Sequence, residues 1–503
     1  MTHGKIDPDE ILLDIDHPTT LWAQPSSFEG IQYVGSLSAS SEIGKGTEIV
    51  TVKHGTLVNI YIAHDLLGVR KVIVTLGYDT SEFEEEPGLY WTAYYRRFMP
   101  FRIQGYSDSI KIRSLAIADV TVEVDENLYD FKATQWSVLP TSLDLFSWAP
   151  SPSTPHLLED FTVSAIDWNT PEVQGYSFLV MNHCVYAMIA HKSGERFSYD
   201  MSGHKSLRYS WFYIRMDLGE RISELWIRQH RWPSNKDPSR QARTLILRTS
   251  KELREGGTES RSIVLGNTMS PRDLDQANPI ARYQAIVSMP KTGPCRMFYA
   301  NTQENRTWLG FEQVPTWHGR GVKHDPTLPR EEHRPEDCIY TSAELEDVRE
   351  VTPCRSWKKG RPDAILGLLL TYTNDQRRCV GSVRLDYLDQ PILVSSRSMW
   401  VGFRVGGNPP LDGNDRSDRS GIEWLGFSWP PPVPNPDLEY LEVPWRGRLD
   451  WYVAYLECYL YHYEDSQPRD EMHQVLDRES ANQSSLFRPV LATGTFFEHL
   501  GTM

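Results

Sequence analysis

Residues 48–62 read EIVTVKHGTLVNIYI and residues 69–76 read VRKVIVTL. Both segments are rich in β-branched residues, which favour strands because their side chains pack well on a pleated surface. Gly55 divides the first segment, and Asp65-Leu-Leu-Gly68 supplies turn residues between the two. The pattern predicts strands joined by tight turns, and it sets the fold class expected for the whole chain.

A strand, a polar turn, a shorter strand and a glycine recur at 58–77, 222–266 and 365–381. Repeated hairpins of this kind predict a mainly β protein with stacked antiparallel sheets, β-prism-like or β-sandwich-like, and long proline-rich loops. Residues 1–30 are acidic and are expected to be irregular. Further strands are predicted at 109–124, 176–190, 207–216, 221–228, 244–249, 262–265, 365–372, 380–385 and, as a final pair, 449–462, with a short helix at 469–476.

The chain has 503 residues, which is too long for one ordinary core. Three prolines in the stretch 148–156 (WAPSPSTPH) indicate a linker or a long loop. We therefore expect an N-terminal β domain at 1–150, a central β block at 151–310 and a C-terminal β block at 311–503. The last two blocks are expected to pack together, and the chain is expected to end in a polar tail.

The formal net charge of −15 argues against nucleic acid and anionic membranes as partners, because both need a cationic protein face. The N-terminus lacks the apolar core of a signal peptide, and the longest apolar run, 365–370, is too short to cross a bilayer. The six cysteines are scattered without a CxxC pair. These features predict a cytoplasmic protein with reduced thiols and no membrane insertion.

Sequence motifs for the common catalytic sites are missing: there is no GxSxG, HExxH, Walker loop or GxGxxG after a strand. His318, His324 and His333 lie too far apart for a metal site within one segment. The acidic stretch 412–418 does not place oxygen ligands at alternate positions, as a calcium loop does. We expect neither a metal nor a cofactor.

Three short clusters combine cationic and aromatic residues. Arg70 and Lys71 follow a turn, Arg355 and Trp357 precede a strand, and 399–404 (MWVGFR) alternates, which places Trp400 and Arg404 on one face. One interpretation is surface decoration by cation–π contacts and salt bridges. The other is a pocket with apolar walls and one or two fixed charges.

The chain from about residue 207 to 462 resembles a widespread family of fungal proteins of unassigned role, some of them attached to F-box segments. The resemblance lies in ERISELWIR (220–228) with RTLILRTSK (243–251) and SIVLG (262–266), in YTSAELEDVREVTPCRSW (340–357), in AILGLLLTYTNDQRRCVGSVRLD (364–386), in VPWRGRLDWYVAYLECYLYH (443–462), and, nearer the N-terminus, in HDLLGVRKVIV (64–74). It implies strand repeats similar to those of jacalin-type lectins.

Some proteins associated with this family are hetero-Diels–Alderases of tropolone-sesquiterpenoid pathways. That resemblance implies a cofactor-independent pericyclase, which dehydrates a hydroxymethyl tropolone to a quinone methide and guides its cycloaddition onto a humulene-type terpene. It implies hydrophobic small-molecule substrates. The family supplies no residue-level motif, so the site is our own prediction: catalytic Arg70, Lys71 and Arg404, and substrate-binding Arg355, Trp357, Trp400 and Phe403.

Two alternatives stay open at this stage. A lectin-like module that binds carbohydrate or protein without catalysis would also use the chain's 16 Trp and 24 Tyr residues as contact platforms. A scaffold partner is the role that the F-box link suggests, but the N-terminus of this chain contains no segment that resembles an F-box.

Overall fold

The structure is a computed structural model of the chain. It describes residues 9–15, 19–39, 46–53, 58–76, 86, 88–97, 101–119, 134–140, 146–148, 162–181, 184–195, 199, 209–230, 243–252, 258–266, 281–301, 307–312, 316–317, 339–356, 364–404, 422–428, 435, 438–453 and 458–464.

The fold is mainly β, as predicted: strands account for 73% of the described residues and form seven mostly antiparallel sheets there. The described residues contain no α-helix, and their one helical turn is the 3₁₀ segment η2 (Leu385–Tyr387). A parallel pairing joins β10 (Thr134–Trp136) to β12 (Thr162–Trp168). The short connections between successive strands explain the antiparallel preference, because parallel neighbours need long crossovers.

The chain divides into two compact units, Met1–Asp167 with Cys295–Val314, and Trp168–Pro294 with Pro315–Met503. The three-block division predicted from the sequence remains a prediction, because this grouping does not test independent folding.

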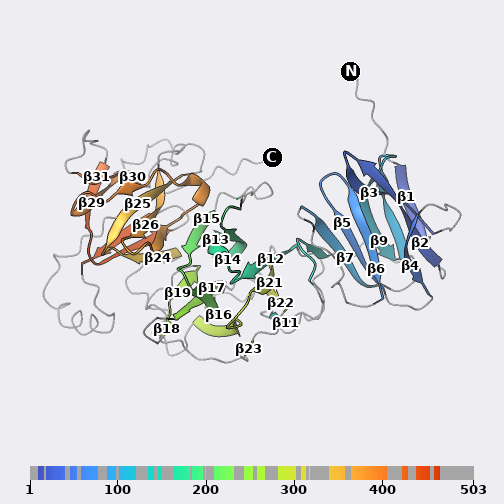
Figure 1. Ribbon diagram of the computed structural model, residues 1–503, viewed down its shortest axis with the longest axis horizontal. Helices are drawn as coiled ribbons and strands as arrows, with labels where there is room; N and C mark the ends of the chain where they lie inside the picture. Colours follow the sequence, from blue (N-terminus) through green and yellow to red (C-terminus); the bar gives the residue numbers. More distant parts are fainter. Residues whose placement is uncertain are drawn as a thin grey trace, which may run out of the picture. The chain divides into compact units, whose positions relative to one another are not determined.

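The sheets of the first unit pair in the following orders, and Figure 1 draws the N-terminal strands in blue. They are β1 (Asp9–Ile15), β8 (Phe101–Ser107) and β9 (Ile112–Asp119); β3 (Ile31–Ser38), β2 (Thr19–Phe28) and β4 (Thr47–Val52); and β11 (Phe146–Trp148), β22 (Thr307–Phe311), β21 (Cys295–Asn301), β12, β10, β7 (Tyr90–Arg97), β5 (Val58–His64) and β6 (Val69–Thr75).

The second unit contains the other four sheets. They are β14 (Cys184–Lys192), β13 (Val173–Met181) and β15 (Tyr209–Arg215); β18 (Thr258–Glu259), β17 (Arg243–Glu252), β16 (Glu220–His230), β20 (Ala281–Ser288) and β23 (Thr316–Trp317), with β19 (Ser262–Leu265) on β17; β24 (Ile339–Glu344), β32 (Arg448–Val453) and β33 (Cys458–Tyr463); and β28 (Ile392–Leu393), β25 (Val348–Arg355), β26 (Ile365–Tyr372), β30 (Ile422–Gly426), β29 (Ser398–Arg404) and β31 (Leu438–Pro444), with β27 (Arg377–Gly381) on β26.

Strand β5 is buried on both faces, which explains its nearly continuous apolar sequence. Val58, Ile60 and Ile62 enter one core, which strands of all three sheets of the first unit share. Tyr61 and Ala63 enter a second core with aromatic residues of β7, β10 and β21. The alternation of side chains along the strand therefore connects two apolar layers through one backbone.

The largest core of the second unit surrounds β26, whose residues are almost all buried. Strands β25, β29, β30, β32 and β33 each contribute side chains to it. Trp451 on β32 is fully buried there. Burying a large side chain of this kind stabilises a fold by about 1.5–3 kcal/mol.

Most predicted strands are confirmed, and two expectations are wrong. Residues 1–30 were expected to be irregular, but they contain the strands β1 and β2. β1 pairs with β8, and β2 pairs with β3 and β4. The strand predicted at 380–385 ends at Gly381, where φ is +78° and the backbone cannot continue an extended strand. The predicted helix at 469–476 lies outside the described residues.

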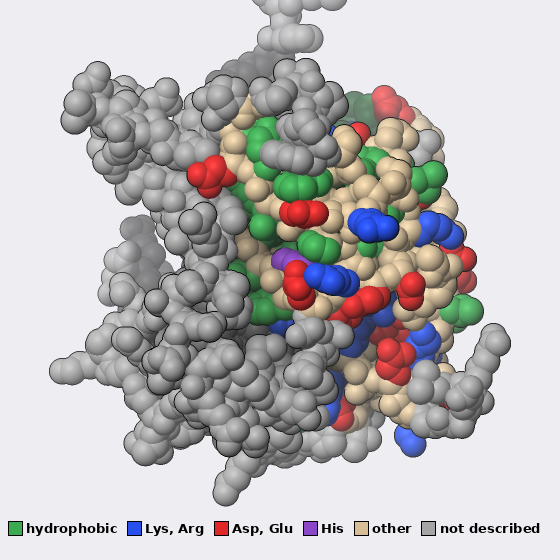
Figure 2. Space-filling model, turned by 90° about the vertical axis from the view of Figure 1, so that its left-hand side faces the viewer, with side chains coloured by type: hydrophobic (Ala, Val, Ile, Leu, Met, Phe, Trp, Pro, Cys, Tyr) green, Lys and Arg blue, Asp and Glu red, His purple; other side chains and the backbone are tan. Residues whose placement is uncertain are grey.

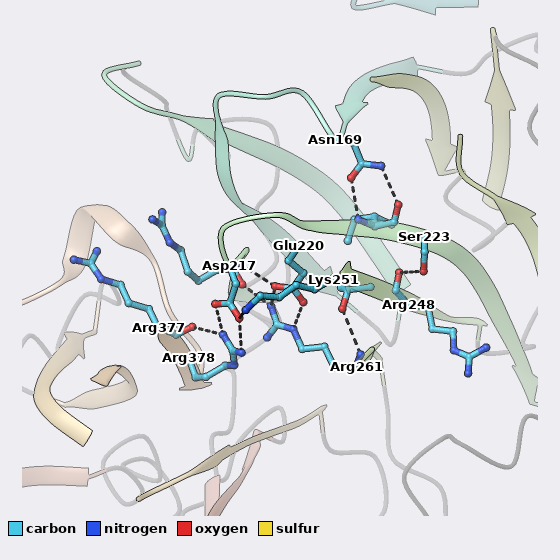
Figure 3. Close-up of polar contacts among 12 residues, drawn as sticks. Asn169, Asp217, Glu220, Ser223, Arg248, Lys251, Arg261, Arg377 and Arg378 are labelled. Carbon is cyan, nitrogen blue, oxygen red and sulfur yellow. Dashed lines mark hydrogen bonds and ion pairs between the residues drawn. The ribbon is translucent and has the colours of Figure 1, made fainter. Parts of the chain in front are cut away.

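Asn169 fixes the start of the second unit to β16. Its backbone is left-handed, with φ of +61°, a conformation that asparagine tolerates better than most residues. Its side-chain amide donates to the carbonyl of Ile222 at 2.9 Å and accepts from the backbone N–H of Ile222 at 2.9 Å (Figure 3). The side chain therefore replaces a pair of strand hydrogen bonds.

Candidate functional site

One face of the three-stranded sheet β14–β13–β15 carries a buried group of polar side chains. In the β13–β15 register, Ser177 lies opposite Tyr213 and Gly175 lies opposite Arg215. Gly175 also lies opposite His191 on β14. Because paired residues project to the same face of a sheet, this register gathers groups that are far apart in the sequence.

Gly175 makes room for the Tyr213 ring. A Cβ atom at this position would lie 2.6 Å from the Tyr213 hydroxyl and 2.5 Å from the carbonyl oxygen of Ile214. Both distances are shorter than any ordinary contact, so only glycine fits here without a shift of the neighbours. The missing side chain lets Tyr213 lie across the middle strand, next to His191.

Ser177, His191 and Tyr199 form a hydrogen-bonded chain. Nε2 of His191 lies 2.7 Å from Oγ of Ser177, and the hydroxyl of Tyr199 lies 3.0 Å from the same Oγ. The backbone N–H of Leu385 donates to the Tyr199 oxygen at 3.2 Å. The hydrogen bonds fit either direction, depending on the tautomer of His191. We call this hydrogen-bonded chain the relay.

Burial keeps both ends of this relay uncharged near neutral pH. It lowers the pKa of His191 to about 4, because a buried imidazolium loses its hydration. It also raises the pKa of Tyr199 to about 12, against smaller lowering effects from Ser177, the Leu385 N–H and the Arg384 charge. The relay therefore contains a neutral imidazole and a protonated phenol.

Aromatic rings enclose the relay. Tyr199 packs edge-on against Trp211 with ring centroids 4.8 Å apart, and His191 packs edge-on against Tyr213 at 5.4 Å. Leu179 and Trp211 belong to the same apolar cluster as Tyr199. Such contacts hold the relay groups in fixed orientations and exclude bulk water.

Arg384 covers the outer side of Tyr199. Its guanidinium lies 4.7 Å from the centre of the Tyr199 ring and 4.8 Å from that of Tyr387, and it pairs with Asp386 at 2.6 Å. The Arg384 side chain is 11% exposed, whereas Tyr387 is 38% exposed. The relay therefore approaches the surface beside a cation and an exposed aromatic ring.

The nearby thiol of Cys354 is not poised as a nucleophile. Burial raises its pKa to about 12, so the thiolate is not populated near neutral pH. Its sulfur accepts a hydrogen bond from the backbone N–H of Arg384 at 3.3 Å. All five cysteines that the structure describes are free.

A serine bonded to a histidine is also the arrangement of nucleophilic hydrolases. Ser177 has no exposed surface, however, and it lies between His191 and Tyr199. At the other end of the relay, Tyr199 is 6% exposed and the Arg384 side chain over its ring is 11% exposed. The arrangement is therefore best suited to proton transfer and hydrogen bonding at that end.

The predicted residues Arg70 and Lys71 lie together on β6 in the first unit. Arg70 pairs with Asp65 at 3.3 Å and with Glu86 at 3.4 Å, and its Nε donates to the carbonyl of Gln32 at 2.7 Å. Lys71 also pairs with Glu86. These contacts join β6 to the turn at Asp65, to Glu86 and to β3.

The other predicted residues lie in the second unit. Nε of Arg355 donates to Asp389 at 2.9 Å. Trp400 and Phe403 project from opposite faces of β29: Phe403 is 2% exposed in the apolar core, and Trp400 is half-buried. Trp357 and the side chain of Arg404 lie outside the described residues, although the Arg404 backbone pairs with Leu438. The assignment of these residues to a site remains a prediction.

The relay residues were not predicted from the sequence. The one signal for them is a set of polar residues inside otherwise apolar strands: Ser177 within residues 176–181 (YSFLVM), and His191 after residues 184–190 (CVYAMIA). Tyr199 and Leu385 carry no such signal.

The surface that the structure describes is mixed in character. Figure 2 shows one face of the molecule, on which acidic and basic side chains are interspersed and apolar side chains form small groups. Within the described ranges, no three His, Cys, Asp or Glu side chains gather as a metal site would require. The same part of the chain contains no helix long and apolar enough to span a membrane. That nucleic acid and membranes are unlikely partners remains a prediction from the sequence.

Comparison with models of known protein families finds no match for this chain, and comparison with curated protein sequences finds none either.

Proposed function

We propose that the chain is a cofactor-independent pericyclase, which dehydrates a hydroxymethyl tropolone to a quinone methide and guides its hetero-Diels–Alder addition to a humulene-type terpene. The observation that carries the proposal is the Tyr199–Arg384 pair at the end of a neutral proton relay. It combines a proton donor, a cation and aromatic walls, which are the groups that this reaction needs.

In the proposed first step, the substrate's C–O bond breaks and the hydroxyl leaves as water with a proton from Tyr199. The ring hydroxyl of the tropolone then returns a proton to Tyr199, so the protein is unchanged and the quinone methide is neutral. Between these transfers, the Leu385 N–H and Ser177 stabilise the Tyr199 oxygen through the hydrogen bonds they share with it. The Arg384 guanidinium adds a positive charge above the ring.

In the proposed second step, one C–O and one C–C bond form between the quinone methide and the terpene, and no atom is lost. Such a step needs orientation more than acid–base chemistry. Holding two reactants together can lower a barrier by about 7–11 kcal/mol. Tyr387, as the exposed ring beside Arg384, offers an apolar contact for the hydrocarbon.

A carbohydrate-binding module without catalysis is the second candidate. The observation that favours it is the exposed Tyr387 ring, with Arg384 and Asp386 beside it. An aromatic face with flanking charged groups can also hold a sugar ring by stacking and by hydrogen bonds to its hydroxyls. This candidate requires binding alone and has no use for the buried relay.

The test is product formation by purified protein from a hydroxymethyl tropolone and humulene. We expect wild type to form the adduct faster than buffer, and Y199F and R384Q each to lower the rate about 100-fold. R446Q is the matched control, because Arg446 is 62% exposed and pairs with Glu464 at the surface. A wild-type rate equal to that in buffer contradicts the proposal, and saturable sugar binding in that case supports the second candidate.

A further inference from the structure

Two hairpin turns of the first unit share one hydrogen-bonding pattern. In residues 65–68, between β5 and β6, the carboxylate of Asp65 accepts from the backbone N–H groups two and three residues later, at 2.7 and 3.0 Å. In residues 108–111, between β8 and β9, the carboxylate of Asp108 accepts from the equivalent N–H groups at 3.0 and 2.8 Å. In both turns the aspartate N–H donates to the carbonyl three residues later, at 3.1 Å. Each turn is therefore held by its backbone and its own aspartate.

The side chains at the apex of these turns are large, apolar and exposed. Leu66 is 94% exposed and Ile110 is 51% exposed, and Leu67 is exposed as well. Ile31, directly after the two-residue turn of the β2–β3 hairpin, is also exposed. Single exposed apolar side chains are ordinary, but a group of them in one place marks an interaction surface.

Contacts between the hairpins bring the three turns side by side. Arg113 on β9 pairs with Asp108 at 2.6 Å and donates to the carbonyl of Leu67 at 2.7 Å, so it joins the two aspartate turns. Nζ of Lys111 lies 3.6 Å from the centre of the Phe28 ring, directly before the β2–β3 turn. The exposed apolar residues therefore belong to neighbouring turns. We call this surface the apolar tip, and its residues are Ile31, Leu66, Leu67 and Ile110.

The charged groups around the apolar tip balance one another. Arg70 pairs with Asp65 at 3.3 Å, as Arg113 does with Asp108. The charged residues of the three turns and these two arginines sum to zero, with three carboxylates against three cations: Glu29, Asp65 and Asp108, and Arg70, Lys111 and Arg113. The tip therefore suits an uncharged or zwitterionic surface rather than an anionic one.

The backbone of the two aspartate turns has hydrogen-bond partners within the protein. Besides the N–H groups bound by the aspartates, the N–H of Ser109 donates to Oγ of Ser107 at 3.1 Å, and the Leu67 carbonyl accepts from Arg113. Lipid offers no partner for backbone polar groups, so they must be satisfied internally before a segment enters it. A polar protein surface makes no such demand, because it supplies hydrogen bonds of its own. The satisfied backbone therefore favours lipid as the occupant.

We propose that the apolar tip docks the chain on a zwitterionic lipid bilayer by inserting the side chains of Leu66, Leu67 and Ile110 among the headgroups. Such insertion is shallow and needs no spanning segment. The overall charge of −15 argues against attraction to anionic lipids, but apolar burial needs no cationic face. The relay and Arg384 contribute no residue to the tip, so the proposal does not depend on the pericyclase activity.

The experiment is cosedimentation of the full chain with vesicles of pure phosphatidylcholine, at low and at high salt. We expect wild type to bind, with an affinity that changes less than about twofold with salt, because apolar burial is not screened. L66Q and I110Q should each weaken binding at least about 10-fold, since each removes the burial of one large apolar side chain. L66F keeps the apolar area and should bind within about twofold of wild type.

L218Q is the matched control. Leu218 is 96% exposed in the turn between β15 and β16 and does not belong to the tip, so L218Q should change binding by less than about twofold. Melting curves verify that each variant is folded. Loss of binding at high salt, or equal weakening by L218Q, overturns the proposal. An absence of wild-type binding overturns it too, and a dimer that L66Q disrupts in sedimentation velocity would then assign the tip to a second copy of the chain.

Discussion

The buried imidazole of His191 makes the stability of the second unit depend on pH. The pKa of His191 falls from 6.5 to about 4 on folding, and its side chain is 4% exposed. A base with a lowered folded pKa contributes stability that is fully present above its unfolded pKa of 6.5. This stability is lost as the pH falls toward 4. In that range His191 is protonated in the unfolded chain but stays neutral in the native state.

The magnitude follows from these two pKa values. Between about pH 7 and about pH 5 the unfolded state gains about 2 kcal/mol from protonation of this one residue, at about 1.4 kcal/mol per pKa unit. The substitution His191→Gln removes the titrating group. The stability advantage of wild type over H191Q should therefore shrink by about 2 kcal/mol over this range, while contributions from other residues cancel in the comparison.

The assay is urea denaturation of both proteins at several pH values, followed by circular dichroism. Comparing the two proteins at each pH separates His191 from carboxylates such as Asp217 and Glu220. Ion pairs lower the pKa of both of these groups despite burial, and the stability they contribute is lost only at more acid pH. A wild-type advantage that stays constant from pH 7 to pH 5 refutes the reasoning.

Three substitutions test the packing. Asp217→Asn should lower the free energy of unfolding, measured by urea denaturation, by about 3 kcal/mol. The substitution breaks a bidentate pair and leaves the half-buried Arg378 without its counter-charge. A loss below about 1 kcal/mol, which is typical of an exposed pair, contradicts this. Gly175→Ala should cost about 2 kcal/mol by overpacking against Tyr213, with a lowered melting temperature as the readout and an unchanged one as the contrary result. Phe403→Ala should lower the free energy of unfolding by about 4 kcal/mol in urea denaturation, because it leaves a cavity in the core. If the variant instead alters substrate binding at unchanged stability, Phe403 belongs to a site.

The strands could be predicted because their signal is local. Residues 365–372 form β26 as predicted. A short, continuous apolar run is typical of a strand that is buried on both faces, as β26 is. Residues 262–265 also form a strand as predicted, β19, in which Ile263 and Val264 are β-branched and half-buried. The strand predicted to run on to residue 385 fails because Gly381 allows the chain to turn, which composition alone does not reveal.

The relay could not be predicted because its geometry depends on long-range register. Tyr199 meets the backbone of Leu385 across 186 residues, and Ser177 meets His191 only because β13 and β14 pair in one register. A shift by one residue would move Ser177 to the other face of the sheet. Sequence patterns specify which residues alternate, but not which strand lies opposite.

The cationic clusters illustrate the same limit. Arg70 was predicted from its place after a turn and Arg355 from its neighbour Trp357, and both arginines have carboxylate partners in the structure. Arg384 was not among the predicted site residues, and it stacks on two tyrosine rings. The partner of a cation is set by tertiary contacts, so residue type and local sequence do not distinguish these cases.

The enantiomeric excess of the adduct tests the proposed function most directly. A cycloaddition held on the protein should yield one enantiomer in large excess, and Y199F and R384Q should lower both the rate and this excess, whereas R446Q should preserve them. A quinone methide that reacts free in solution gives a racemic adduct. Racemic product in the presence of wild-type protein, even if formed faster than in buffer, would contradict a guided cycloaddition.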